Sequence, residues 1–342
     1  MAGNRKQLKR LAFLIFCSIL LPLLLSAQKR VRFSADTSLC DTGQWRMVWN
    51  DEFEGNRLDL SKWYTFIDDE NWVNGVVADP PVSAAARASK KVVYKDENVS
   101  VANGNCTLTV KYEPSEWMGA QRNFSSGMIM VKNADATAPL YFVRGRFEMR
   151  AKLPRATGIW ATLWLYGGGS ATEPGSEIDM LEYAPCQSDL DRIPWHIHGF
   201  HRGSSLNVHN ETGGSYRERP DDWHIYTTEW DRHFIRFYVD GNLKAAYSRY
   251  GSDCVPDATR EYPEDAADVF PGVEEGMKLL ATLDLTDDLY SRSVAGICVP
   301  IPRWLKNRNK TDEKFSTQHF IIDYIRVYQR EGAIQDIFSG NN

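Results

Sequence analysis

Alternation of apolar and polar residues with period two is the feature that most limits what this chain can fold into. Between Arg144 and Leu153, apolar side chains occupy every second position from Phe147 onward, with charged ones between them. No long stretch keeps a 3.6-residue period, whereas parallel α/β folds need helical crossovers between their strands. The pattern therefore predicts an all-β chain of two packed antiparallel sheets.

The segments expected to form strands are rich in β-branched and aromatic residues and are separated by Gly, Asn, Asp and Pro. They are Trp45–Trp49, Val92–Tyr94, Cys106–Tyr112, Gly127–Lys132, Gly145–Leu153, Ile159–Tyr166, Ser176–Tyr183, Trp195–Phe200, His224–Trp230, His233–Val239, Met277–Leu285 and His319–Gln329. The Asp240-Gly241 pair predicts a tight hairpin turn after Val239.

Residues 1–27 have the pattern of a secretory signal peptide. Basic residues precede an uncharged apolar run from Leu11 to Leu25 and the small pair Ser26-Ala27. Because the run is short for a membrane span, we expect cleavage after Ala27 without stable membrane insertion. The mature protein is then secreted, periplasmic or attached to the cell surface. We expect one domain over residues 28–330 and a C-terminal tail over 331–342.

Composition narrows the class of partner. The net charge of −5 argues against nucleic acid, which usually requires a basic excess. The chain has 11 Trp, 15 Tyr and 15 Phe, and aromatic faces can hold the apolar faces of sugar rings, although many must lie in the core.

We expect a monomer. Five cysteines remain after removal of Cys17, an odd set that allows at most two disulfides.

Three acids, Glu177, Asp179 and Glu182, lie within one short stretch. On a helix, the first and last would point about 140° apart. On a regular strand, Glu177 and Asp179 share a face while Glu182 points away. A β-bulge at Met180-Leu181 corrects this and brings all three carboxyls onto one surface.

Paired carboxyls on a rigid surface suit cleavage of a glycosidic bond. One carboxyl attacks the anomeric carbon or orients the attack, and the other protonates the leaving oxygen. The alternative to a catalytic site is that these acids simply form a solvent-exposed acidic face of the strand. The aromatic segment that precedes the acids favours a sugar-binding site, because Trp160 and Trp164 share a face and can line such a site. The alternative for both tryptophans is packing in the core.

Three histidines follow in the segment from Trp195 to His201. His196 and His198 share one face, and His201 lies on the other. Such spacing also occurs in zinc sites, but no cysteine or acid completes a site locally. We therefore favour a hydrogen-bonding role in the substrate site, and we assign it to His198.

Sequence motifs along nearly the whole mature chain occur in the order of one known family. They are Trp49–Gly55 with Leu58-Asp59 and Lys62-Trp63, Gly145–Glu148, Leu153-Pro154, Gly158–Trp160, Trp164, Ser176–Glu182, Asp222–His224, Glu229-Trp230, Phe237–Gly241 and Asp323–Tyr328. Together they resemble glycoside hydrolase family 16. The resemblance implies a β-jelly-roll sandwich with a concave substrate cleft and endo-acting hydrolysis of a polysaccharide without a catalytic cofactor.

The resemblance also implies roles for the acids in a retaining mechanism: Glu177 as nucleophile, Asp179 as its assistant and Glu182 as acid/base. A charged Glu177 is expected to raise the pKa of Glu182. Two residues between Asp179 and Glu182 resemble the laminarinase-like, agarase-like and carrageenase-like members. Since Ala161 departs from the laminarinase-like pattern, the substrate stays open between a β-glucan and a marine galactan.

A calcium ion away from the cleft is a further implication of the resemblance, with Glu52 and Asp323 at the matching positions. Two other functions stay open. A lectin-like sandwich would bind carbohydrate without cleaving it, and a transglycosylase would use the same acids with a sugar acceptor. The intact acid trio favours an enzyme, because binding alone does not require it.

Overall fold

The structure is a computed structural model in which residues 36–342 form one compact unit. It describes residues 43–65, 72–73, 76–77, 92–117, 120–133, 139–167, 176–185, 189–200, 209–231, 234–248, 260–261, 276–286, 315–330 and 337–339. The expected signal peptide, residues 1–27, lies outside the described residues.

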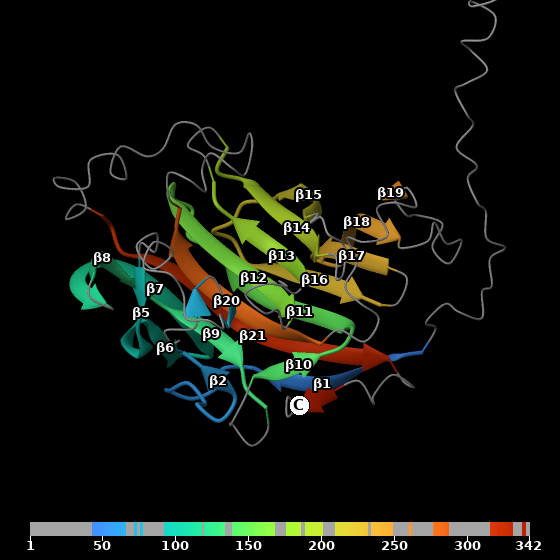
Figure 1. Ribbon diagram of the computed structural model, residues 1–342, viewed down its shortest axis with the longest axis horizontal. Helices are drawn as coiled ribbons and strands as arrows, with labels where there is room; N and C mark the ends of the chain where they lie inside the picture. Colours follow the sequence, from blue (N-terminus) through green and yellow to red (C-terminus); the bar gives the residue numbers. More distant parts are fainter. Residues whose placement is uncertain are drawn as a thin grey trace, which may run out of the picture. The chain divides into compact units, whose positions relative to one another are not determined.

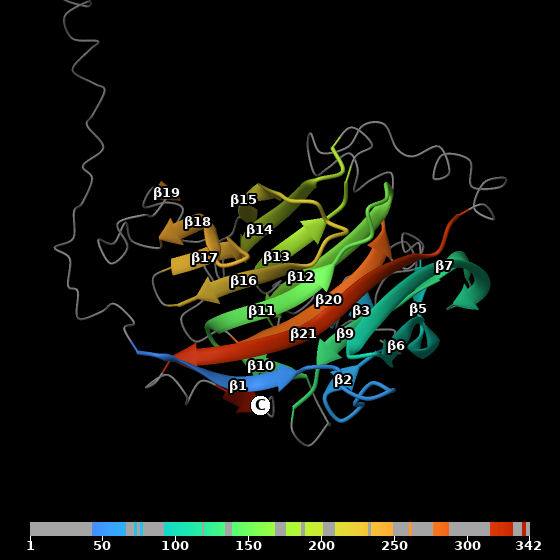
Figure 2. The same cartoon turned by 180° about the vertical axis from the view of Figure 1, so that it is seen from behind.

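Two sheets make up this unit (Figures 1 and 2). The larger sheet contains β1 (Trp45–Asp51), β5 (Val92–Tyr94), β6 (Val99–Ala102), β7 (Asn105–Trp117), β8 (Ala120–Ser126), β11 (Gly145–Lys152), β16 (His224–Trp230), β17 (Phe234–Val239), β18 (Asn242–Ser248), β19 (Arg260–Glu261) and β21 (Gln318–Arg330). Most neighbours pair antiparallel; β5 with β8 and β18 with β19 pair parallel.

The smaller sheet carries the three acids. It contains β2 (Trp63–Tyr64), β9 (Met128–Val131), β10 (Leu140–Phe142), β12 (Ile159–Gly167), β13 (Glu177–Tyr183), β14 (Arg192–Phe200), β15 (His209–Arg217), β20 (Met277–Leu285) and β22 (Ile337–Ser339). A separate hairpin joins β3 (Trp72–Val73) to β4 (Val76–Val77), and a 3-10 turn covers Asp96–Asn98.

One core cluster takes side chains from both sheets. In β11, buried and partly buried residues alternate along the whole strand, as its sequence predicts. Phe147 of β11, Leu163 of β12 and Leu283 of β20 are each at most 1% exposed within this cluster. Each sheet thus buries one face against the other, and the second face of the smaller sheet is left to carry the acids.

The expected strands are all present; β7 continues five residues beyond the expected end at Tyr112, and the other ends differ by at most three residues. The predicted hairpin turn is confirmed, since Asp240 and Gly241 have φ of 51° and 75° between β17 and β18. The expected tail contains one correction: β22 pairs with β10 in the smaller sheet. The sequence did not predict strands β2, β3, β4, β6, β8, β10, β15 or β19.

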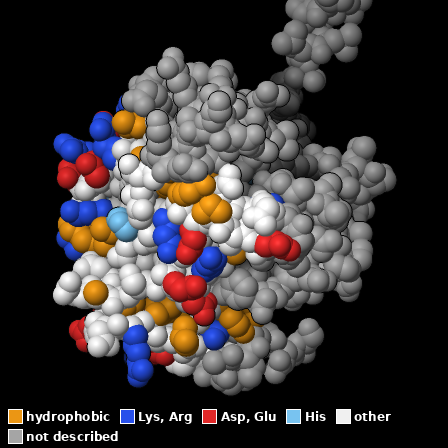
Figure 3. Space-filling view, turned by 90° about the vertical axis from the view of Figure 1, so that its left-hand side faces the viewer, with side chains coloured by type: hydrophobic (Ala, Val, Ile, Leu, Met, Phe, Trp, Pro, Cys, Tyr) orange, Lys and Arg blue, Asp and Glu red, His pale blue; other side chains and the backbone are white. Residues whose placement is uncertain are grey.

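None of the described elements is a helix with the length and hydrophobicity needed to cross a membrane. On the described part of the face in Figure 3, acidic and basic side chains are interspersed rather than segregated by sign.

Asp51 fixes the end of β1, which pairs with β21 at the edge of the larger sheet. Its carboxylate accepts hydrogen bonds from the Trp63 indole Nε1 at 2.7 Å and from the Phe53 backbone N at 2.9 Å. Phe53 has a positive φ of 48° and stacks on Trp63. One buried carboxylate therefore joins the first strand to the smaller sheet.

The Asp51→Ala variant should lower the free energy of unfolding by about 1 to 3 kcal/mol, because it leaves the buried Trp63 N–H without its acceptor. Chemical denaturation measures this change. The exposed Glu54, substituted by Ala, is the control and should change stability by less than about 0.5 kcal/mol. Equal effects of the two substitutions would show that the Asp51 contacts do not stabilise the fold.

Candidate active site

The expected β-bulge is present in β13. Pairing with β12 sets Leu163 opposite Leu181 and Trp164 opposite Asp179, so that Met180 is the additional residue. Both Met180 and Leu181 are fully buried in the core cluster. Because two successive apolar side chains point inward, the next residue, Glu182, returns to the face of Asp179.

The three carboxyls consequently share one face of the smaller sheet. Opposite them on β12 lie Tyr166 for Glu177, Trp164 for Asp179 and Thr162 for Glu182. Asp179 and Glu182 are only 3% and 7% exposed, whereas Glu177 is partly buried. Rigid strand backbones on both sides thus hold three acids in a largely dry environment.

Two histidines of β14 face these acids. The register places His198 opposite Glu177 and His196 opposite Asp179. His198 Nε2 lies 3.1 Å from Asp179 Oδ2, and His196 Nδ1 lies 2.5 Å from Glu182 Oε2. The structure thus places His198 among the acids, where the sequence predicted it, and adds His196, for which the sequence offered only the shared face.

Glycine in β15 makes room for His196. A Cβ atom on Gly213 would lie 2.4 Å from His196 Cδ2 and 2.6 Å from the Trp195 carbonyl oxygen. Any other residue at this position would therefore displace the imidazole or the paired strand. The close contact limits where the His196 ring can lie relative to Glu182.

The electrostatic environment of the site shifts the pKa values of Glu177 and His196. Removal from water raises its pKa well above the ordinary value of 4.5, the negative charge of Asp179 raises it further, and His198 opposes the rise. For His196, burial alone would lower the pKa, but the hydrogen bond and charge of Glu182 raise it above 6.5. Burial and neighbouring charge therefore make Glu177 harder to ionise than an ordinary glutamate.

Trp160 and Trp164 lie on the same face of β12 as the sequence predicts, and both are partly buried. Trp164 packs edge-on against Tyr166, with 5.7 Å between ring centroids. Its indole Nε1 is buried and has no hydrogen-bond partner among the described residues. A buried N–H in a polar site is a position for a ligand acceptor such as a sugar hydroxyl.

A buried lysine lies along the same face, on β20. Lys278 is opposite Tyr166, and its Nζ lies 5.1 Å from the centre of that ring. Burial lowers the pKa of Lys278 to about 7. The face beside the acids therefore combines aromatic rings with a weakly basic amine.

The two residues proposed for calcium lie elsewhere, and each is in an ion pair. Both carboxylate oxygens of Glu52 accept hydrogen bonds from Arg326, at 2.8 and 2.7 Å. Asp323 Oδ2 accepts one from Arg150 at 2.5 Å. Because each carboxylate is directed at a guanidinium group, this arrangement does not fit a calcium site.

A family model described as "Glycosyl hydrolases family 16" matches residues 87–282. The match covers more than half of the 342-residue chain and includes all three acids and both histidines.

Curated relatives include two glucanases. A glucan endo-1,3-beta-glucosidase A1 from Niallia circulans is 28% identical over 215 residues, which are 58% of this chain and 28% of that protein. A beta-glucanase from Rhodothermus marinus is 26% identical over 298 residues, 83% of this chain and 85% of that protein. The chain therefore spans under a third of the first relative but most of the second.

Among solved structures, the catalytic domain of an endo-1,3-beta-glucanase (laminarinase) from Thermotoga petrophila RKU-1 is similar, with a TM-score of 0.59 and 22% identity. The alignment covers 84% of this chain and 99% of that one. This structural similarity concerns the fold alone, and it confirms the expected β-jelly-roll sandwich.

Replacing Glu182 by Gln should lower the pKa of His196, because the substitution removes the carboxylate charge that raises it. NMR titration of the imidazole C–H signals, assigned with a His196→Gln variant, measures the change. Gln at the exposed Glu116 is the matched control and should leave the titration of His196 unaltered. An unchanged or higher pKa of His196 in Glu182→Gln would contradict the coupling.

Proposed function

The chain belongs to glycosyl hydrolases family 16, and from this membership we propose that it is a retaining endo-glycosidase that hydrolyses β-glycosidic bonds in a polysaccharide. We propose Glu177 as the nucleophile, Glu182 as the acid/base and Asp179 as the residue that assists Glu177. The observation that carries the proposal is the bulge in β13, which brings all three carboxyls onto one face.

In the first step, the Glu177 carboxylate attacks the anomeric carbon while Glu182 donates a proton to the leaving oxygen. Attack requires Glu177 to be ionised. Because burial and the charge of Asp179 raise the pKa of Glu177, we assign to Asp179 the role of taking up the proton that Glu177 gives up before attack. His198 contacts Asp179 and orients the carboxyl that takes up this proton.

In the second step, Glu182 removes a proton from water, which then releases the sugar from Glu177. His196 Nδ1 contacts the Glu182 carboxyl, so the pair can hold the proton that Glu182 first delivers and later recovers. The Glu182 carboxyl, supported by the His196 imidazole, therefore carries the proton in both steps.

The substrate class follows from the rest of the face. Trp160 and Trp164 present aromatic surface beside the acids, and the Trp164 indole N–H offers a donor for a sugar hydroxyl. The two curated relatives described above are named as a glucan endo-1,3-beta-glucosidase and a beta-glucanase, which supports a β-glucan as substrate; a marine galactan is the second candidate. We propose further that the protein is exported with cleavage of its signal peptide after Ala27, acts as a monomer and needs no catalytic cofactor.

Glu177→Gln and Glu182→Gln should each reduce turnover by orders of magnitude, because each removes a group that one step requires, and Asp179→Asn should reduce it less. Reducing-end release from laminarin, lichenan, agarose, porphyran and carrageenan measures activity, and circular dichroism checks folding. Glu54→Gln, at an exposed acid, is the control and should retain full turnover. Near-normal turnover of Glu177→Gln would refute its role as nucleophile.

The same panel separates the alternative functions. Binding to one polysaccharide, without release of products from any polysaccharide of the panel, would favour the hypothesis of a lectin-like protein. Longer oligosaccharides, formed when an acceptor sugar is added, would favour transglycosylation.

The acid limb of kcat/KM should lie above pH 4.5, because Glu177 stays protonated and unreactive to higher pH than an ordinary glutamate. In Asp179→Asn the limb should move to lower pH, since the charge that helps to raise the pKa of Glu177 is gone. Rates on a soluble polysaccharide across pH measure both. A limb that moves upward in Asp179→Asn would contradict this assignment.

Retention is tested with an activated aryl glycoside. Glu182→Ala should regain activity with added azide and give a product of retained configuration, because azide intercepts the glycosyl-enzyme. An inverted azide product would rule out the two-step route.

A further inference from the structure

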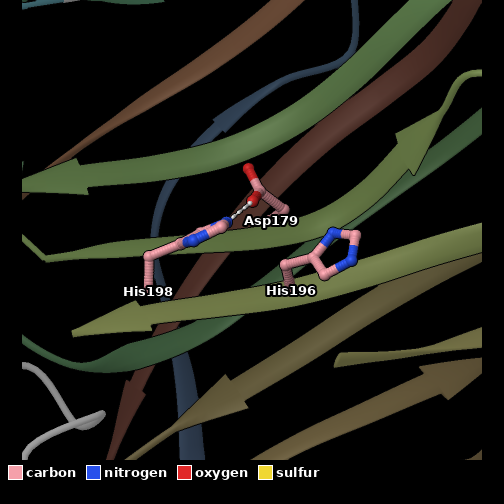
Figure 4. A group of neighbouring side chains, drawn as sticks. All are labelled: Asp179, His196 and His198. Carbon is pink, nitrogen blue, oxygen red and sulfur yellow. Dashed lines mark hydrogen bonds and ion pairs between the residues drawn. The ribbon is translucent and has the colours of Figure 1, made fainter. Parts of the chain in front are cut away.

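Asp179, His196 and His198 form a cluster with the composition of a metal site. Each offers one ligand atom, and these atoms lie within 4.8 Å of one another (Figure 4). The sequence indicated no acid beside the histidines. The pairing of β13 with β14 supplies one, because it sets Asp179 opposite His196.

The geometry is close to that of tetrahedral zinc. Zn–N and Zn–O bonds of about 2.0 to 2.2 Å place neighbouring ligand atoms about 3.4 Å apart. Asp179 Oδ2 and His198 Nε2 are already 3.1 Å apart. The widest separation must close by only about 1.4 Å, which rotation of the partly exposed His196 side chain can supply.

A fourth donor lies beside one of the three ligands, His196. Glu182 Oε2 is 2.5 Å from His196 Nδ1, so its carboxylate can complete the coordination when the imidazole turns to the metal. Two imidazoles with carboxylate oxygens are a donor set that zinc takes in proteins.

The surroundings also favour a divalent cation. Three carboxyls share this face, and two of them are almost fully buried. A bound cation offsets the repulsion among such groups and is the largest local charge wherever it binds. The pairing of β13 with β14 holds the backbones of the three ligands in register, so that only side chains must move.

We propose that Asp179, His196 and His198 bind one Zn²⁺ ion, with Glu182 as the fourth ligand, and that the ion reversibly inhibits the protein. The binding site is independent of any activity, whereas the inhibition rests on the proposed function. Zinc would occupy the carboxyl that assists Glu177 and the carboxyl that protonates the leaving oxygen. Neither catalytic step could then proceed.

Calorimetric titration of the full chain with ZnCl2 tests the site, with thiols alkylated beforehand so that cysteines do not compete. The wild type should bind one Zn²⁺ that is lost or weakened at least about tenfold in His198→Gln. His319→Gln is the matched control, since His319 is exposed on the larger sheet, and it should bind as the wild type does. Absence of binding to the wild type, or equal binding by His198→Gln, would overturn the proposal.

Cobalt supplies a readout that depends on geometry. Co²⁺ in the site should give the visible absorption of four-coordinate cobalt with the wild type and with His319→Gln, and not with His198→Gln. The spectrum of six-coordinate aqueous cobalt in all three proteins would count against the site.

Inhibition is measured separately, as the loss of reducing-end release on adding ZnCl2 and its recovery with EDTA. Full activity at a zinc concentration that saturates the calorimetric site would refute the inhibitory role. Because the titration and the cobalt spectrum need no polysaccharide, failure of the hydrolase assignment and failure of the zinc site are distinguishable.

Discussion

Burial of one apolar face of each sheet against the other is the constraint on which the acid site depends. It requires Met180 and Leu181 to enter the core together, and the strand can satisfy both only by forming a bulge. Without the bulge, Glu182 would point into an apolar interior, where an unpaired carboxylate is very costly. Hydrophobic packing on one side of β13 therefore determines the arrangement of charge on the other side.

The larger sheet uses its charged residues in a different way. Arg146 of β11 pairs with Glu148 on its own strand and with Glu229 on β16, while Arg326 of β21 pairs with Glu52. Opposite charges placed across neighbouring strands support the register of the sheet, although each partly exposed pair contributes little stability alone. Glu52 thus belongs to a structural ion pair, which is why the family-derived expectation of a calcium ligand does not fit here.

The acid face carries an electrostatic cost that the rest of the fold avoids. Glu177, Asp179 and Glu182 have the same charge sign and lie close together in a poorly hydrated place. The two histidines of β14 partly offset this repulsion. Such local conflict is typical of functional sites, and it supplies both the raised pKa of Glu177 and the affinity for a cation that we propose.

Local sequence patterns were sufficient to predict the all-β class, the hairpin at Asp240-Gly241, the bulge at Met180-Leu181 and the shared face of Trp160 with Trp164. Each depends on the polarity and turn preference of residues close together in the chain, which a pattern of period two can reveal.

Which side chains meet across neighbouring strands depends instead on the folded arrangement of the whole chain. His196 reaches Glu182 and His198 reaches Asp179 because of the register between β13 and β14, which local pattern does not encode. Strand β15 stayed hidden because its Gly213-Gly214 pair is typical of a loop, whereas the structure needs both glycines to let the side chains of β14 pack against it. The pairing of β22 with β10 was missed for a related reason: long-range hydrogen bonds depend on where the rest of the chain has folded.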